Sequence, residues 1–334
     1  MRVVTTQPRD FTQVLHAFYS VFTRFSYTLI IRIGKHGRPL MNKKKERIIK
    51  YLFTTLAFAS LVFLIGIVLV LFKEALPIFI KVSPKAFLLG QSWYPTAEPA
   101  EFGILPLILA SLWVTLGALV ICVPLGVGSA LYLHELAGPR QRAVLKPVIE
   151  ILASVPSIVY GFFGMVILAP MLQDSFNLPI GLCVLTTSII LGVMATPTVA
   201  SIAEDALSYV PRSFREASFA VGADRWQTLT KVIIPAAGSG ISTAIILGMS
   251  RAIGETMTVL MVAGGSAVIP SSIFDPVRPM TAAIAAEMGE APVGSDHYNA
   301  LFAIALILFL ITFVFNIAAE LISRRFRLKL GLSR

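Results

Sequence analysis

Long apolar runs without charged residues are the feature that most constrains how this chain folds. A helix of about 20 such residues crosses the hydrocarbon core of a bilayer. Five runs meet this length without a charge, and a sixth contains only Arg251 and Glu255. The runs are Tyr51–Phe72, Ile104–Leu133, Ile151–Gln173, Ser175–Ala203, Val232–Gly264 and Tyr298–Ala319. The sequence therefore predicts an all-α integral membrane protein with six transmembrane helices.

Composition excludes several classes of protein. Only 14% of the residues are charged, whereas soluble domains carry about 25%. So few charges cannot give a compact fold a polar surface, which excludes a soluble enzyme, a nucleic-acid-binding domain and a disordered chain. The two cysteines, Cys122 and Cys183, lie inside apolar runs, and the four histidines are scattered. We therefore predict no metal site, no cofactor and no catalytic residue.

The net charge of +10 is concentrated at the two ends of the chain. Basic and non-basic loops alternate between the apolar runs, and basic loops stay in the cytoplasm. This predicts both termini in the cytoplasm of a multi-pass protein in the bacterial inner membrane. The predicted parts are a basic segment 1–50, a first transmembrane helix with its loop 51–103, a five-helix core 104–323 containing a cytoplasmic loop 204–231, and a basic tail 324–334.

Two interpretations of the first 40 residues are open. The stretch 11–33 is half apolar but contains Arg24 and Arg32, which is typical of an amphipathic interfacial helix. Alternatively, translation starts at Met41, because the lysines that follow it resemble a natural basic N-terminus leading into the first span.

The chain has no phosphate-cradling motif G-x-x-x-x-G-K followed by Ser or Thr. It therefore lacks its own ATP site, and any ATP that drives it binds to another subunit. A transport subunit without enzymatic activity fits this pattern.

The loop 204–231 contains a short amphipathic helix after Pro211, with small residues on it and Gly222 at its end. ABC-importer permeases share a cytoplasmic signature E-A-A, three residues, Gly, nine residues, then I-x-L-P, and this loop resembles it. The matching residues are Glu216, Ala217, Ser218, Gly222, Val232, Ile234 and Pro235, with departures at Ser218, Val232 and Ile234 that keep size. The resemblance implies a coupling helix that docks on an ATPase; the alternative is an ordinary interfacial loop.

Arg251 and Glu255 are the two charges inside an apolar run. Each costs about 2.5–3.5 kcal/mol at a helix centre on insertion scales. Their spacing of four places them on one helix face, where they can pair. We interpret them as lining a polar pathway, and an arginine there suits an anion. The alternative is an ion pair that locks two helices without contacting substrate.

Ser157 follows Pro156 at the start of a span. The proline frees backbone groups, and nearby hydroxyls and N–H groups are then available to an anion. The alternative is that Pro156 only kinks a helix and the serines cap it.

Four stretches together resemble PstC-type permeases of phosphate-specific ABC importers. They are VPSIVYG at 155–161, GMSRAIGETM at 248–257, FDPVRP at 274–279 and AEMGE at 286–290. With the coupling loop, the resemblance covers roughly residues 104–323. It implies the MetI-like permease fold and a substrate pathway that includes Arg251, Glu255, Thr256 and Ser157.

The resemblance also implies partners and a substrate. These are inorganic phosphate, a PstA-type second permease, a cytoplasmic ATPase dimer and a periplasmic phosphate-binding protein. The physics of the residues leaves two alternatives open: a permease for another anion such as sulfate, or an ion-coupled secondary transporter or channel without an ATPase. The coupling loop favours the ABC importer, because the second alternative has no use for it.

Overall fold

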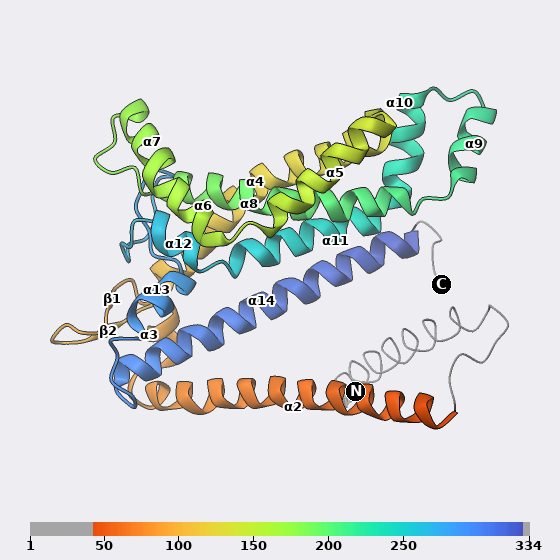
Figure 1. Ribbon diagram of the computed structural model, residues 1–334. Coiled ribbons are helices and arrows are strands. Elements are labelled where there is room, and N and C mark those ends of the chain that lie inside the picture. Colours follow the sequence, from red (N-terminus) through yellow and green to blue (C-terminus); the bar gives the residue numbers. More distant parts are fainter. Residues whose placement is uncertain (1–42, 330–334) are drawn as a thin grey trace, which may run out of the picture. The chain divides into compact units, whose positions relative to one another are not determined.

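The computed structural model describes residues 43–329 (Figure 1). Residues 1–42 and 330–334 lie outside this range, so the expectations for the first 40 residues and the end of the basic tail are not addressed. Within the described residues, six helical segments are long and apolar enough to cross a membrane, as expected. They are Tyr51–Lys81, Leu105–Leu136, Ser157–Phe176, Val184–Ser208, Arg225–Ile253 and Asp296–Leu321.

The first span belongs to the long helix α2 (Lys43–Lys81). A boundary between two structural units falls within this helix, after Ile67. In the part before the boundary, large apolar side chains such as Phe53, Leu56 and Phe63 are exposed. A helix that is apolar all round and exposed is suited to contact lipid.

The second unit is built around three helices: α4 (Leu105–Leu131), α8 (Val184–Ser208) and α11 (Ile234–Ile253). Helices α4 and α8 pack against each other most extensively. Helix α11 lies between α8 and α14 (Asp296–Lys329) (Figure 1). Glycines allow the close approach: a Cβ on Gly117 would collide with Ser188, and one on Gly192 with Ile121. Small residues at helix contacts are typical of membrane proteins, where close packing rather than the hydrophobic effect drives the association of helices.

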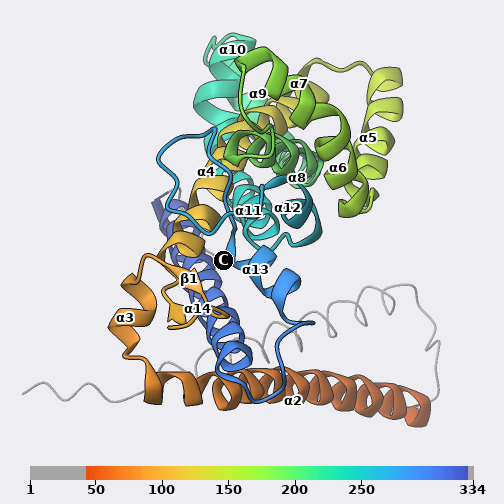
Figure 2. The ribbon, with the colours of Figure 1, turned by 90° about the vertical axis from the view of Figure 1, so that its left-hand side faces the viewer.

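Two of the expected apolar runs are interrupted. The third candidate span, Ser157–Phe176, consists of α6 (Ser157–Phe163), α7 (Ala169–Phe176) and the turn between them. Helix α5 (Pro139–Ser154) precedes this span and packs against α8, and Figure 2 shows it at the edge of the bundle. The fifth ends at Ile253, and a short helix α12 (Met257–Val262) follows it. The uninterrupted runs expected at 151–173 and 232–264 are therefore each divided by a break.

Three π-helical turns occur in the part of the chain that the structure describes. They are η1 (Tyr132–Leu136), which follows α4, η2 (Gly164–Leu168), between α6 and α7, and η3 (Leu229–Ile233), which precedes α11. The short helices α9 (Arg212–Ala220) and α10 (Arg225–Thr228) form the loop before η3.

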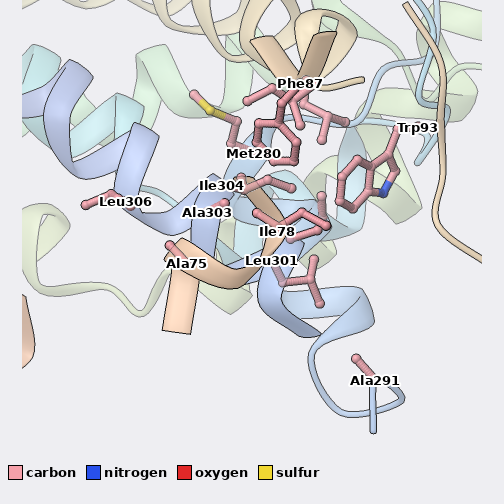
Figure 3. Packing of buried hydrophobic residues seen from close by; sticks show 14 residues of the cluster. Ala75, Ile78, Phe87, Trp93, Met280, Ala291, Leu301, Ala303, Ile304 and Leu306 are labelled. Atoms are coloured by element: carbon pink, nitrogen blue, oxygen red, sulfur yellow. The ribbon is translucent and has the colours of Figure 1, made fainter. Parts of the chain in front are cut away.

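An apolar cluster closes one end of the second unit (Figure 3). It joins the last turns of α2, α3 (Pro84–Leu89), β1 (Trp93–Tyr94), α13 (Met280–Glu287) and α14. Strand β1 pairs antiparallel with β2 (Glu101–Phe102). The largest fully buried members of the cluster are Ile78, Phe87, Trp93, Ile104, Leu107, Met280, Leu301 and Ile304.

Glu287 holds the polar rim of this end together. Its carboxylate accepts hydrogen bonds from Trp93 Nε1 at 3.0 Å and Arg278 Nη1 at 2.6 Å, and it contacts His297 Nε2 at 2.9 Å. Arg278 Nε also donates to the Gly265 carbonyl at 2.7 Å. One carboxylate therefore connects β1, the segment 265–279 and the start of α14.

The segment 265–279 caps helix α8. The first N–H groups of a helix have no partner within it, and here Val184 N and Leu185 N donate to the carbonyls of Asp275 and Ile273 at 3.1 and 2.8 Å. The Asp275 carboxylate in turn accepts from Ser271 N, Ser271 Oγ and Ser272 N at 2.8–2.9 Å. This small turn therefore determines where the segment meets α8.

The Asp275 turn gives a pH-dependent prediction. The hydrogen bonds from Ser271 and Ser272 hold the pKa of Asp275 below its ordinary value of 3.8. The ionised Asp275 carboxylate therefore stabilises the turn fully above about pH 4, and this stabilisation is lost as the pH falls through the lowered pKa. We expect the amide hydrogen-exchange protection of Ser271 and Ser272 to follow this curve. Asp275→Ala should lower their protection and abolish its pH dependence; equal protection in both proteins would contradict the role of the carboxylate.

Candidate functional site

Two helix breaks adjoin each other in the second unit. Helix α5 ends at Ser154 and α6 begins at Ser157, with Val155 in an extended conformation. Pro156 explains this break, because a proline lacks the N–H and disfavours the helical conformation of the residue before it. The second break is Gly254–Thr256, between α11 and α12, and α12 packs against α6.

Thr258 joins the two breaks. Its Oγ1 donates to the Ser157 carbonyl at 2.9 Å, and the residue is fully buried. The contact is close because Gly161 faces it: a Cβ there would lie 3.1 Å from Thr258 Cα and 2.8 Å from Met261 Sδ. Sequence analysis did not single out Thr258. A lone threonine in an apolar helix carries no pattern, although its place directly after the sequence GETM at 254–257 is a usable signal.

Arg251 lies in the last turn of α11 and reaches across to α5. Its Nη2 donates to the Ala153 carbonyl in a long contact of 3.5 Å. Ala153 is in the last turn of α5, where carbonyls lack helical partners. The Nε atom of Arg251 is buried and has no hydrogen-bond partner among the described residues. A guanidinium offers five N–H donors, so this side chain retains donor capacity next to a helix break.

Glu255 does not pair with Arg251, so the expectation of a same-face pair was wrong. Helix α11 ends at Ile253, and the two residues therefore do not share one continuous helix. Glu255 Oε1 instead accepts from Thr258 N at 3.4 Å, and its carbonyl accepts from Thr281 Oγ1 of α13 at 2.8 Å. Within the described residues the two side chains form no ion pair.

Thr256 and Ser157 complete the predicted pathway set. Both are half-buried. Thr256 Oγ1 contacts the Gly254 carbonyl at 3.4 Å within the break, and Ser157 begins α6. The structure therefore brings all four predicted residues to the two adjoining breaks. A partly buried arginine with unused donors, next to polar groups of interrupted helices, is suited to bind an anion.

The coupling motif also has a defined geometry. Helix α9 ends at Ala220, and Gly222 follows with φ of 85°, which confirms that a glycine in the left-handed conformation ends it. Glu216 and Ala217 are exposed on α9, whereas Ser218 is buried and its hydroxyl bonds Thr228 Oγ1 at 2.8 Å. Pro235 lies in the first turn of α11. An open groove of about 480 Å³ is lined by Ser213, Phe214, Ala217, Ser218 and Val232.

Comparisons with known proteins identify sequences and a structure that resemble this chain. Residues 122–328 match the family "Binding-protein-dependent transport system inner membrane component". The chain is 41% identical to a probable ABC transporter permease, YqgH of Bacillus subtilis, over 73% of this chain and 79% of that one. It is 34% identical to the phosphate transport system permease PstC of Mesorhizobium japonicum, over 74% and 80%.

A solved structure shows a similar fold. A chain of a bacterial alginate ABC transporter, in complex with an alginate-bound periplasmic protein, matches with a TM-score of 0.60. The sequences are 13% identical, and the match covers 84% of this chain and 96% of the other. The likeness confirms the expected fold and carries no information about substrate.

Gly161 gives a prediction about the contact between the breaks. Gly161→Val should force α6 away from Thr258 and Met261, and we expect the free energy of unfolding to fall by about 1–3 kcal/mol, the usual effect of overpacking. Thermal unfolding in detergent measures it. The control is Gly128→Val on α4, where an added Cβ meets nothing within 4 Å. Equal effects of the two substitutions would contradict the close contact.

Proposed function

The chain belongs to the family of binding-protein-dependent transport system inner membrane components, and we propose that it is a PstC-type subunit that moves inorganic phosphate. It is a multi-pass inner-membrane permease of an ABC importer, a transport subunit without catalytic activity of its own. A binding-protein-dependent importer works with a binding protein and an ATPase. Family membership removes the alternative of an ion-coupled secondary transporter or channel.

The arrangement of Arg251 is the observation that carries the proposed pathway. A buried donor without a partner costs about 1–3 kcal/mol, and Arg251 Nε is such a donor. An anion entering the break between α11 and α12 supplies the missing acceptors, because a guanidinium matches phosphate oxygens in pairs. Thr256 and Ser157 add polar groups at the same level. These three residues, with Glu255, form the proposed substrate pathway.

Glu255 favours phosphate over sulfate. An ionised carboxylate only accepts hydrogen bonds. Hydrogen phosphate carries an O–H that donates to such a group, whereas sulfate at neutral pH has no proton to donate. A site built around a hydrogen bond discriminates strongly against an analogue that lacks it. The negative charge of Glu255 also weakens anion binding, which allows release on the other side of the membrane.

The exposed face of α9 supports the proposed coupling to the ATPase. Glu216 and Ala217 are exposed there, and Phe214 and Phe219 each expose about two fifths of their surface (40% and 43%). Together with the groove beside Val232, this face offers apolar surface and a carboxylate to a partner. We assign the docking of a cytoplasmic ATPase dimer to this face. Gly222 follows the end of α9, and Pro235 lies at the start of α11, after the coupling loop.

The remaining assignments follow from this function. A second, PstA-type permease forms the pathway together with this chain, and a periplasmic phosphate-binding protein delivers the substrate. Both termini are cytoplasmic, as the basic ends of the chain favour. We assign the chain the four parts expected from its sequence, which are 1–50, 51–103, 104–323 and 324–334, with 204–231 as the coupling loop.

The pathway is tested by substituting Arg251. In proteoliposomes with the partner subunits, Arg251→Gln should lower ATP-dependent uptake of labelled phosphate about tenfold or more, because hydrogen bonds to charged groups contribute about 1.5–3 kcal/mol. Arg140→Gln, an exposed position on α5, is the control and should transport normally. Unchanged uptake by Arg251→Gln would remove Arg251 from the pathway. If the unaltered transporter takes up labelled sulfate but not phosphate, the substrate is sulfate and not phosphate.

The coupling surface is tested at Gly222. A side chain at its φ of 85° costs about 1–2 kcal/mol, and asparagine tolerates this conformation better than valine does. We expect Gly222→Val to reduce co-purification of the ATPase subunit clearly and Gly222→Asn to reduce it only slightly. Since no atom lies within 4 Å of the added Cβ, packing does not explain a difference. Wild-type association in Gly222→Val would argue against docking on this face.

A further inference from the structure

Helix α5 is fastened to α8 by charges rather than by an apolar core. None of its residues is fully buried. Its half-buried positions form a single stripe at spacings of three and four, namely Arg142, Lys146, Ile149 and Ala153. This stripe faces α8, against which α5 packs. Two of its four members are basic, so the position of α5 depends on what those two side chains contact.

Both basic residues meet at Glu204 of α8. The Glu204 side chain is 1% exposed and accepts from Arg142 Nη2, from Lys146 Nζ at 2.6 Å and from Ser208 Oγ at 3.0 Å. A carboxylate buried this deeply requires partners, because an unpaired buried charge is strongly destabilising. We call Glu204, Arg142 and Lys146 the α5 latch. The neighbouring Asp205 is exposed, and among the described residues its carboxylate forms an ion pair with Lys146 alone, at 3.0 Å.

Polar contacts continue from the latch to the coupling helix α9. Ser208 Oγ lies 3.4 Å from His134 Nδ1, and His134 Nε2 lies 3.5 Å from Glu135 Oε1. Glu135, in η1, then accepts a hydrogen bond from Arg215 of α9. Side chains from α9, η1, α8 and α5 therefore form one connected series.

The other end of α5 reaches Arg251. The Ala153 carbonyl, in the last turn of α5, is the acceptor for Arg251 Nη2. The single helix α5 therefore carries the latch residues near its start and the Arg251 contact at its end.

We propose that Glu204 is a positioning residue for transport, which holds α5 so that Ala153 O engages Arg251 and links that contact to α9. The inference rests on the proposed function and deepens it. Ala153 O and the transported anion compete for the same guanidinium. A shift of α9 that moves Arg215 and Glu135 alters the latch, moves α5 and changes how many Arg251 donors are free. The coupling face and the pathway thereby act on one two-position element.

A charged latch is suited to this task. A well-packed apolar contact holds a helix at least as firmly as a buried ion pair does. Ion pairs, in contrast, have discrete partners and can exchange one partner for another. The latch thus gives α5 a defined position without fixing it permanently.

The test uses the complete transporter, with its partner permease, ATPase and binding protein. Glu204→Gln keeps the shape of the side chain and removes its charge. Spin labels at Val148 on α5 and Val193 on α8, both exposed, report the distance between the helices; the native Cys122 and Cys183 are buried. We expect the distance distribution to broaden and phosphate uptake per ATP hydrolysed to fall about tenfold, within the range of coupling between linked sites. The matched control, Asp205→Asn, should leave both unchanged.

Several other outcomes decide against the proposal. It is overturned if Glu204→Gln keeps the wild-type distance distribution, or if the folded variant is less heat-stable but retains its uptake per ATP, which indicates a purely structural role. An equal effect of Asp205→Asn also overturns it. If Glu204→Gln does not fold, Arg142→Gln retains the Lys146 pair and should give the same two changes in smaller size; wild-type values in both overturn the proposal. Absence of phosphate uptake by the unaltered transporter contradicts only the proposed function, because the label distances still test the latch.

Discussion

The structure depends on one constraint, which is that the bilayer core cannot hydrogen-bond a backbone. A helix break at that depth persists only where protein groups or a polar pathway satisfy it. This chain contains two helix breaks side by side, one just before the third candidate span and one just after the fifth. Thr258 bonds the carbonyl of Ser157, Thr281 bonds that of Glu255, and Arg251 bonds that of Ala153. The same interactions that make the breaks tolerable also bring polar groups into an otherwise apolar unit, which is the requirement for a substrate path.

The six spans could be predicted from the sequence, because length and hydropathy alone determine what crosses a bilayer. The break at Pro156 was indicated by the proline itself. The break after Ile253 was not predicted, since glycine is common within membrane helices and gives no definite stop. That omission produced the wrong expectation that Arg251 and Glu255 pair on one face. The residues of the breaks were nevertheless identified, because intramembrane charges are rare and point to function.

Glu204 is a residue whose importance the sequence did not indicate. Hydropathy placed it at the start of the loop 204–231, since the apolar run ends at Ala203, yet it lies within α8 and is among the most buried side chains. Its partners Arg142 and Lys146 are about 60 positions away in the chain (separations of 62 and 58). No local pattern indicates such a contact. Ser218 is a milder case: it was treated as a small substitute for alanine, but its hydroxyl ties α9 to α10 through Thr228.

The π-helical turns have a consequence for how the spans move. A π turn contains one residue more than an α turn, and one residue corresponds to about 100° of rotation around the helix axis. The turn η3 directly precedes α11 and contains Val232 of the coupling motif. If η3 rewound as α-helix, the surplus residue would have to pass to the next segment, and α11 would turn about its own axis. The one surplus residue in η3 therefore helps to set the angle about the α11 axis at which Arg251 lies.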